Sequence, residues 1–142
     1  MTERIRWSIL VWIAVVGFDF FFFLTFAVIL EARGVLILIA LISLLTILAF
    51  RSSQLIIMAN QNEIHVGRAH VERKYIGKVT VLDKEAMRLA RTRDIDPAAY
   101  LNIRFWIPTG VRIDITDASD PTPYWLISSR KNKELAEYLS GQ

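Results

Sequence analysis

The 142-residue sequence contains no cysteine, which excludes a disulfide framework and agrees with the cytoplasmic side of a membrane. It also lacks a Gly-rich phosphate loop, a Gly-x-Ser-x-Gly motif, a His-Glu-x-x-His motif and a Cys/His nucleophile pair. Each of these patterns would place catalytic or cofactor-binding groups together. Because they are missing, we expect a protein that is not an enzyme and binds no cofactor.

Charge is nearly absent from the first third of the chain. Residues 7–30 contain one ionisable side chain, Asp19, and residues 35–50 contain none, with Ser43 and Thr46 as their only polar side chains. About 20 apolar helical residues cross the hydrocarbon core of a bilayer, which is ~30 Å thick. We therefore predict a transmembrane helical hairpin over residues 1–53, with spans at about 7–30 and 34–51. The polar residues 31–34 form its turn.

The basic residues give the hairpin an orientation. Arg4 and Arg6 precede the first span and Arg51 follows the second, whereas Arg33 in the turn is offset by Glu31. Positive residues favour the cytoplasmic side, so we expect a multi-pass protein of the cell (plasma) membrane with both termini in the cytoplasm. A cleaved signal peptide is the alternative for the first span. Its apolar core is too long for that, and no clean small-x-small cleavage site follows it.

From residue 54 onward the composition is that of an ordinary globular domain, and short alternating runs predict strands. The predicted strands cover residues 55–60, 63–66, 69–73, 75–82, 100–106, 111–116 and 124–128. Helices are predicted over 84–92, with Asp83 as the N-cap, and over 129–140, with Leu135, Tyr138 and Leu139 facing inward. A bent antiparallel sheet with a C-terminal helix predicts an α+β fold. We expect a pleckstrin-homology-like (PH-like) antiparallel β-barrel, plugged by that helix, over residues 54–142.

Several short motifs carry a resemblance to a known family. The most distinctive are Asp96-Pro97-Ala98-Ala99-Tyr100 and Asp120-Pro121-Thr122-Pro123-Tyr124-Trp125. Gly67-Arg68-Ala69, Asp83 with Ala86, and Ser128-Ser129-Arg130 accompany them. With these motifs the chain resembles an actinobacterial family of two-helix membrane proteins, classified as a domain of unknown function. The order of its parts resembles that of bacterial membrane-anchored PH-like proteins. The resemblance implies a fold and a layout but no activity, ligand or partner.

Asp19 is the most unusual residue of the hairpin. An ionised carboxylate at mid-membrane costs at least ~2.5–3.5 kcal/mol, so such residues usually face protein. Ser43 and Thr46 lie at a similar depth in the second span, and a protonated Asp19 could hydrogen-bond to either and stabilise the hairpin. A contact with another membrane protein is a second interpretation. A proton or ion relay is a third, although relays normally need several such groups in series.

Basic residues are concentrated early in the β region. Between residues 68 and 93 there are eight basic and three acidic side chains, and between 94 and 120 there are two and five. The candidates for binding anionic lipid or a partner are Arg68, Arg73, Lys74, Lys84, Arg88 and Arg91. The alternative is a solvated helix face with a Glu85–Arg88 pair. No recognition motif accompanies the charge, so nucleic-acid binding is not expected.

His65 and His70 lie on adjacent predicted strands, near Glu63 and Glu72. Without cysteine or a close His-x-x-His spacing, we expect no metal site there.

We expect a non-catalytic membrane-anchored interaction or accessory module, integral to the bilayer, that docks another membrane protein or complex. The hairpin would supply one contact through Asp19 or the aromatic residues 18–23, and the β domain a second, which raises avidity. The alternative is a sensor that binds anionic headgroups through its basic stripe. A membrane enzyme or transporter would depend on Asp19 alone.

Overall fold

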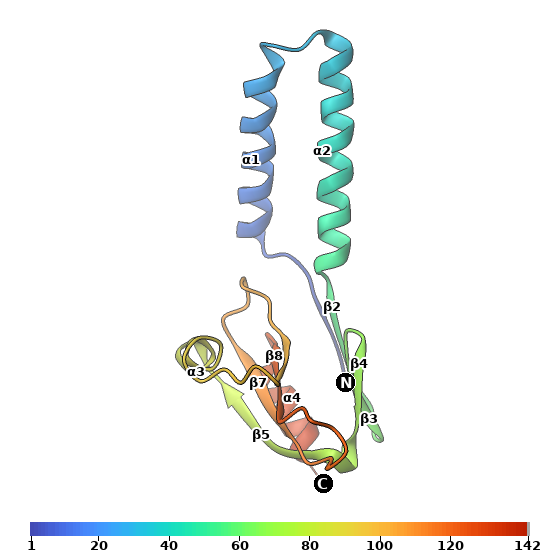
Figure 1. Ribbon diagram of the computed structural model, residues 1–142, viewed down its shortest axis with the longest axis vertical. Coiled ribbons are helices and arrows are strands. Elements are labelled where there is room, and N and C mark those ends of the chain that lie inside the picture. The colour runs from blue at the N-terminus through green and yellow to red at the C-terminus, as the bar shows by residue number, and fades with distance from the viewer. Residues whose placement is uncertain (142) are drawn as a thin grey trace. The chain divides into compact units, whose positions relative to one another are not determined.

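The structure, a computed structural model, describes residues 1–141 (Figure 1). The chain forms two compact units. The first is Arg6–Gln54, here called the hairpin. The second combines Met1–Ile5 with the chain from Leu55 onward and is here called the β domain.

The hairpin consists of helix α1 (Ile9–Ala27) and helix α2 (Ala32–Ser53). Helix α1 begins where the Ser8 hydroxyl accepts a hydrogen bond from the Val11 N–H, as an N-cap does. Both helices are long and apolar enough to cross a membrane, and none of their residues is buried. The two predicted apolar helices are therefore present in the structure.

The turn of the hairpin differs from the prediction. We expected it at residues 31–34, but α2 already begins at Ala32, and the connection spans residues 28–31. The N–H groups of Ile29 and Leu30 both bond to the Phe26 carbonyl, which ends α1. Near the start of α2, a Cβ on Gly34 would lie only 3.3 Å from Leu30 Cβ. The absence of a side chain at Gly34 therefore lets the turn pack closely against α2.

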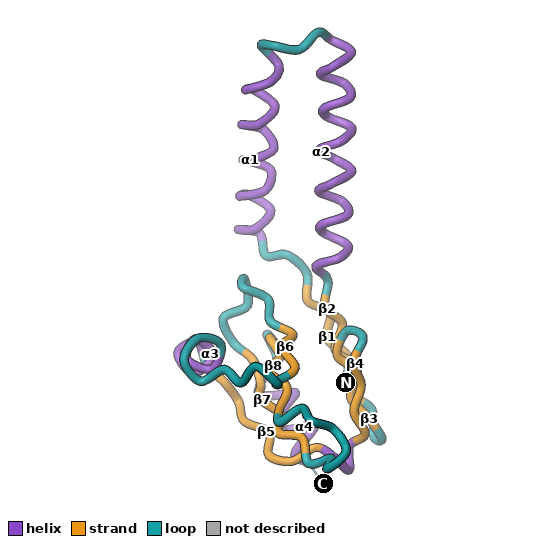
Figure 2. Tube along the Cα trace, viewed as in Figure 1, coloured by secondary structure: helices purple, strands orange, loops and turns teal. Residues whose placement is uncertain are grey.

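The β domain contains eight strands in two four-stranded sheets. The first sheet has the order β1 (Thr2–Ile5), β2 (Leu55–Ala59), β3 (Glu63–Val66), β4 (Ala69–Glu72). The second has the order β5 (Ile76–Leu82), β7 (Gly110–Ile115), β8 (Tyr124–Ser128), β6 (Tyr100–Asn102). Only the β6–β8 pair is parallel. A 3-10 turn, η1 (Arg73–Tyr75), separates the sheets, and helices α3 (Lys84–Ala90) and α4 (Asn132–Ser140) complete the domain (Figure 2).

Strand β1 was not predicted, because in the sequence its residues look like the flank of a membrane span. In the structure these residues pair antiparallel with β2, from Thr2 opposite Met58 to Ile5 opposite Leu55. The sequence before the first span is too short and too charged to signal a strand, and its partner lies some fifty residues further along. The whole hairpin is therefore an insertion between two paired strands.

The predicted PH-like barrel is not confirmed, because the two sheets are open and no ladder joins them within residues 1–141. They nevertheless share one hydrophobic core with α4. Buried side chains come from the first sheet (Ile5, Leu55, Ile57, Ile64, Val66), the second sheet (Val111, Ile113, Trp125, Ile127) and α4 (Leu135, Ala136, Leu139). The predicted inward positions Leu135 and Leu139 are confirmed. The strand predicted over residues 100–106 ends at Asn102, because the chain turns at Phe105 and Trp106.

Candidate functional site

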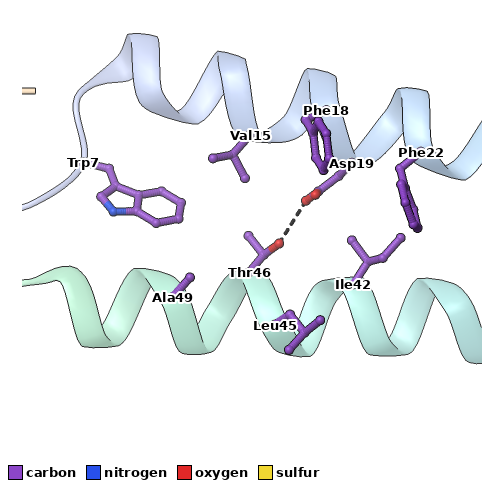
Figure 3. Close-up of a pocket in the computed structure, with 9 residues that line it drawn as sticks. All are labelled: Trp7, Val15, Phe18, Asp19, Phe22, Ile42, Leu45, Thr46 and Ala49. Atoms are coloured by element: carbon purple, nitrogen blue, oxygen red, sulfur yellow. Dashed lines mark hydrogen bonds between the residues drawn. The ribbon is translucent and has the colours of Figure 1, made fainter. Parts of the chain in front are cut away.

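Asp19 lies on the side of α1 that faces α2 (Figure 3). The Thr46 hydroxyl donates a hydrogen bond of 2.9 Å to Asp19 Oδ2, so one of the two predicted partners is confirmed. Ser43, the other, is exposed and is not bonded to Asp19 in the part of the chain that the structure describes. The carboxylate is thus half-buried between the helices rather than aimed outward.

Two apolar grooves of the hairpin meet at Asp19. The larger, of about 430 Å³, is lined by Trp7, Val15, Phe18, Phe22, Ile42, Leu45, Thr46 and Ala49 in addition to Asp19 (Figure 3). The other, of about 290 Å³, is lined by Val16, Phe20, Phe23, Ile39, Ile42 and Ser43, again with Asp19. No second ionisable side chain lines either groove, as far as the described residues show. The arrangement holds one carboxylate against one hydroxyl, which suits helix pairing better than proton transfer.

We predict that Asp19→Ala and Thr46→Val each remove the hydrogen bond that joins the two helices. Interhelical hydrogen bonds of this kind contribute roughly 0.6–2 kcal/mol in a membrane. A double-mutant cycle on the protein in mixed micelles measures the coupling, and it should be absent between Asp19→Ala and the control Ser43→Ala. A larger coupling with Ser43 than with Thr46 would contradict the observed pairing.

Aromatic side chains gather at the end of the hairpin where α1 begins and α2 ends. The rings of Trp7, Trp12 and Phe50 lie 5.0–5.4 Å apart, in edge or tilted contacts. Further along α1, Phe18, Phe22 and Phe26 form a ladder with centroid distances of 6.1 and 4.7 Å. The first cluster thus packs the two ends of the hairpin together through aromatic contacts.

The six basic candidates do not form one surface. Lys84 and Arg88 belong to α3, Arg91 is its C-cap, and Arg68 lies in the turn between β3 and β4. Helix α3 and the strands β3 and β4 lie on opposite sides of the β domain (Figure 1). Arg88 binds Glu85 through two hydrogen bonds of 3.0 and 2.5 Å. This contact lowers the pKa of Glu85 and raises the pKa of Arg88. The helix face is thus partly neutralised, as the alternative interpretation expected.

Arg73 and Lys74 are engaged by neighbouring groups. The Arg73 guanidinium donates to the Tyr138 carbonyl and to those of Leu139 and Gly141, at 3.3 and 3.4 Å, at the end of α4. A cation at a helix C-terminus is favourable because the last carbonyls lack helical partners. Lys74 pairs with Glu72 at 2.7 Å, and this hydrogen bond raises the pKa of Lys74. Arg68, by contrast, lies exposed in the turn between β3 and β4.

The two histidines stack across β3 and β4 with ring centroids 5.4 Å apart. His65 Nε2 lies 2.8 Å from Glu63 Oε1, and this hydrogen bond lowers the pKa of Glu63. Within residues 1–141, no three His, Cys, Asp or Glu side chains lie together in a way that could hold a metal ion.

Sequence reasoning missed Glu3, the buried carboxylate of β1. Its side chain is 7% exposed and accepts hydrogen bonds from the Ser129 hydroxyl and, at 2.9 Å, from the Arg130 N–H. The contact ties the first sheet to the segment that enters α4. No local pattern marks Glu3, because its partners lie at the far end of the chain.

The motif residues that carried the family resemblance pack against one another. The Tyr100 and Trp125 rings lie 4.8 Å apart on the parallel strands β6 and β8. The Tyr124 hydroxyl accepts from the Asp96 N–H at 2.8 Å and donates to the Asp94 carbonyl at 3.3 Å. Asp96 Oδ1 also accepts from the Ala98 N–H at 2.8 Å, which forms the turn. These motifs therefore build the scaffold of the β domain.

Comparison with known proteins identifies one family that matches the chain. Neither the search of curated proteins nor the search of solved structures returned a match. The family model described as "Protein of unknown function (DUF3093)" matches residues 1–139, which include the hairpin, β1 and almost all of the β domain. The chain belongs to this family, DUF3093.

Proposed function

We propose that this protein is a non-catalytic interaction module that is anchored in the cell membrane by its hairpin and docks another membrane protein. The observation that carries the proposal is the insertion of the hairpin between β1 and β2. Because Ile5 and Leu55 are register partners, the chain leaves and re-enters the β domain at adjacent positions. Only residues 6–8 separate β1 from α1, and only Gln54 separates α2 from β2. A β domain connected by two such short segments is held at the membrane instead of ranging on a flexible tether.

The same connection supports a common side for the two ends of the hairpin. Arg4 and Arg6 lie just before the first helix, and Arg51 lies near the end of the second. The positive-inside rule therefore favours the cytoplasmic side for both chain ends of the hairpin. Both termini of the protein are then cytoplasmic. We also propose that the β domain, with its two sheets and C-terminal helix around one core, is PH-like, and that the family is actinobacterial.

The docking surface that we propose is one face of α1. Phe18, Phe21 and Phe22 share that face by their i, i+3, i+4 spacing, and their side chains are exposed. Asp19 is already paired with Thr46, so it stabilises the hairpin while the phenylalanines contact the partner helix. Aromatic side chains are common anchors in protein interfaces.

The alternative function, a sensor of anionic lipid that uses all six basic candidates, has less support. Arg73 is bound to the end of α4, Lys74 to Glu72 and Arg88 to Glu85. Three of the six cations therefore already have close partners, and the others lie on different parts of the β domain. The interaction module remains the function that the geometry supports best.

The test is purification of the protein from its native membrane in mild detergent, followed by mass spectrometry. We expect a stoichiometric membrane-protein partner. Replacing Phe18, Phe21 and Phe22 together by leucine should remove the partner and keep the hairpin apolar enough to insert. The control replaces Leu44, Ile47 and Leu48 of α2, which are also exposed, by alanine. Recovery of the protein alone, or equal recovery of the partner with both variants, would contradict the proposed docking face.

A further inference from the structure

One side chain of the β domain is far more exposed than its chemistry favours. Phe105 is 76% exposed, whereas the other exposed large hydrophobic residues of this domain, Met58, Val81, Ile95 and Leu101, lie between 39% and 47%. Phe105 occupies a turn in which the Ile107 N–H donates to the Arg104 carbonyl at 2.9 Å. Turn corners usually carry small or polar residues, so an exposed aromatic ring here requires an explanation.

The turn is held firmly on both sides, so the exposure of Phe105 is part of the fold. On one side the Arg104 N–H donates to Ser128 Oγ at 2.9 Å. On the other side Ile107 is 2% exposed, within the main core. The Phe105 ring also contacts the Trp106 ring in a T-shaped arrangement, with centroids 4.8 Å apart. Trp106 is partly buried and packs against the core, so it fixes the position of the Phe105 ring that it contacts.

This turn belongs to the edge of the β domain where β1 ends and β2 begins. The preceding strand, β6, is joined to that edge because the Tyr100 hydroxyl donates to the Val66 carbonyl at 3.0 Å. Gly67, the residue after Val66, has a φ of +66°. A Cβ on Gly67 would lie 3.0 Å from Asn102 Nδ2 and 3.8 Å from Leu55 Cδ1, so the β3–β4 turn lies beside both the end of β6 and the start of β2. Figure 2 shows, within the β domain, the loop after β6 and the start of β2 at the same end.

The same edge is basic. Arg68 follows Gly67 in the β3–β4 turn, and Arg4 is one residue from the end of β1; both side chains are exposed. The exposed and half-buried acids of these strands, Glu63 and Glu72, face each other at the opposite end of the β3–β4 ladder. The edge therefore combines a protruding aromatic ring with two cations.

We propose that this edge is a membrane-contact surface. Phe105 enters the boundary between headgroups and acyl chains, and Arg4 and Arg68 bind anionic headgroups. Phenylalanine is among the residues that surface-bound proteins bury at this boundary, and arginines near the surface are attracted by anionic headgroups. The inference rests on the proposed function, since it requires the hairpin to be in a bilayer. This edge carries the end of β1 and the start of β2, which residues 6–8 and Gln54 connect to the two helices of the hairpin. A bilayer surface is therefore the occupant that the chain itself brings to the edge.

The natural lack of cysteine makes a direct test simple. Three single-cysteine variants of the full protein carry an environment-sensitive dye: F105C at the edge, Q61C in the exposed β2–β3 turn at the other end, and L41C on the exposed side of α2. They are reconstituted in vesicles of phosphatidylglycerol and phosphatidylcholine that contain lipids with a quenching group. Phe105 and Gln61 are both exposed, so neither substitution should disturb the core, and circular dichroism checks this.

We expect the F105C dye to be quenched at least about twofold more than the Q61C dye, with emission shifted to the blue, because an interfacial group lies close to the lipid quencher. Adding Arg4→Gln and Arg68→Gln should reduce this quenching in anionic vesicles and have little effect in pure phosphatidylcholine. Equal quenching at F105C and Q61C, with strong quenching at L41C, would overturn this inference alone. Absence of quenching at L41C would show that the hairpin is outside the bilayer, and it would overturn the proposed membrane anchoring together with this inference.

Discussion

Gly110→Ala is expected to destabilise the β domain more than any other single substitution considered for this protein. A Cβ at Gly110 would lie 2.3 Å from the Ile127 carbonyl oxygen and 3.1 Å from Met87 Sδ. The first contact is with the backbone of β8, the strand that pairs with β7, so no side-chain rotation relieves it. Strand β8 is buried along its whole length, which prevents it from moving aside. We expect a loss of about 3 kcal/mol or more, against a total stability of roughly 5–15 kcal/mol for a typical domain.

The measurement is a urea titration of the full protein in detergent micelles, with brief proteolysis to report the folded fraction of the β domain. Two other glycines serve as controls. At Gly77 a Cβ would lie 2.9 Å from the Thr116 Cγ2 methyl group, which can shift, so Gly77→Ala should cost less. At Gly17 nothing lies within 4 Å, so Gly17→Ala should leave the protein folded. A Gly110→Ala protein as stable as the Gly77→Ala protein would show that the β7–β8 contact is looser than described.

Glu3→Ala is expected to have the second largest effect. Glu3 is only 7% exposed, and its removal leaves the Ser129 hydroxyl and the Arg130 N–H without their acceptor. Breaking a buried, charge-assisted contact by removing one partner costs roughly 3 kcal/mol. Glu3→Gln keeps the shape and one acceptor oxygen, so its loss should be smaller, at about 1–2 kcal/mol.

The same urea titration distinguishes these variants, and Glu134→Ala is the matched control. Glu134 also lies near the start of α4 and pairs with Lys131 at 2.9 Å, but both side chains are exposed to solvent. Exposed ion pairs contribute little, so Glu134→Ala should leave the midpoint nearly unchanged. If Glu3→Ala were equally mild, β1 would not hold the segment before α4, and its place in the β domain would need another explanation.

The first residues of the chain show where sequence reasoning reached its limit. Residues 2–5 look like the charged flank of a membrane span, and that flank is also an edge strand in the structure. Four residues are the shortest alternation that indicates a strand, and here the charged residues also suit the flank of a membrane span. What identifies β1 is its pairing with β2 and the burial of Glu3 and Ile5, and both depend on residues far away in the sequence.

The roles of the basic candidates also depend on contacts that the sequence does not reveal. Lys84, Arg88 and Arg91 have helical spacing, and the structure places them together at α3 as predicted. Arg73 and Lys74 looked equivalent in the sequence. Their roles separate only because α4 ends beside Arg73, while Lys74 reaches Glu72. Phe105 was read as part of a strand, and only the turn that follows β6 exposes it.

The sequence by itself determined the two apolar helices, seven of the eight strands, the N-cap at Asp83, the inward positions Leu135 and Leu139, and the depth match of Asp19 with the pair Ser43 and Thr46. Each of these depends on local periodicity or on length, which are visible along the chain. Only the tertiary structure decided that the strands form two open sheets, that the hairpin is inserted between β1 and β2, and that Glu3, Arg73 and Gly110 are structural. The physical reason is that strand pairing, buried hydrogen bonds and close backbone approach join residues distant in sequence, and no local pattern records them.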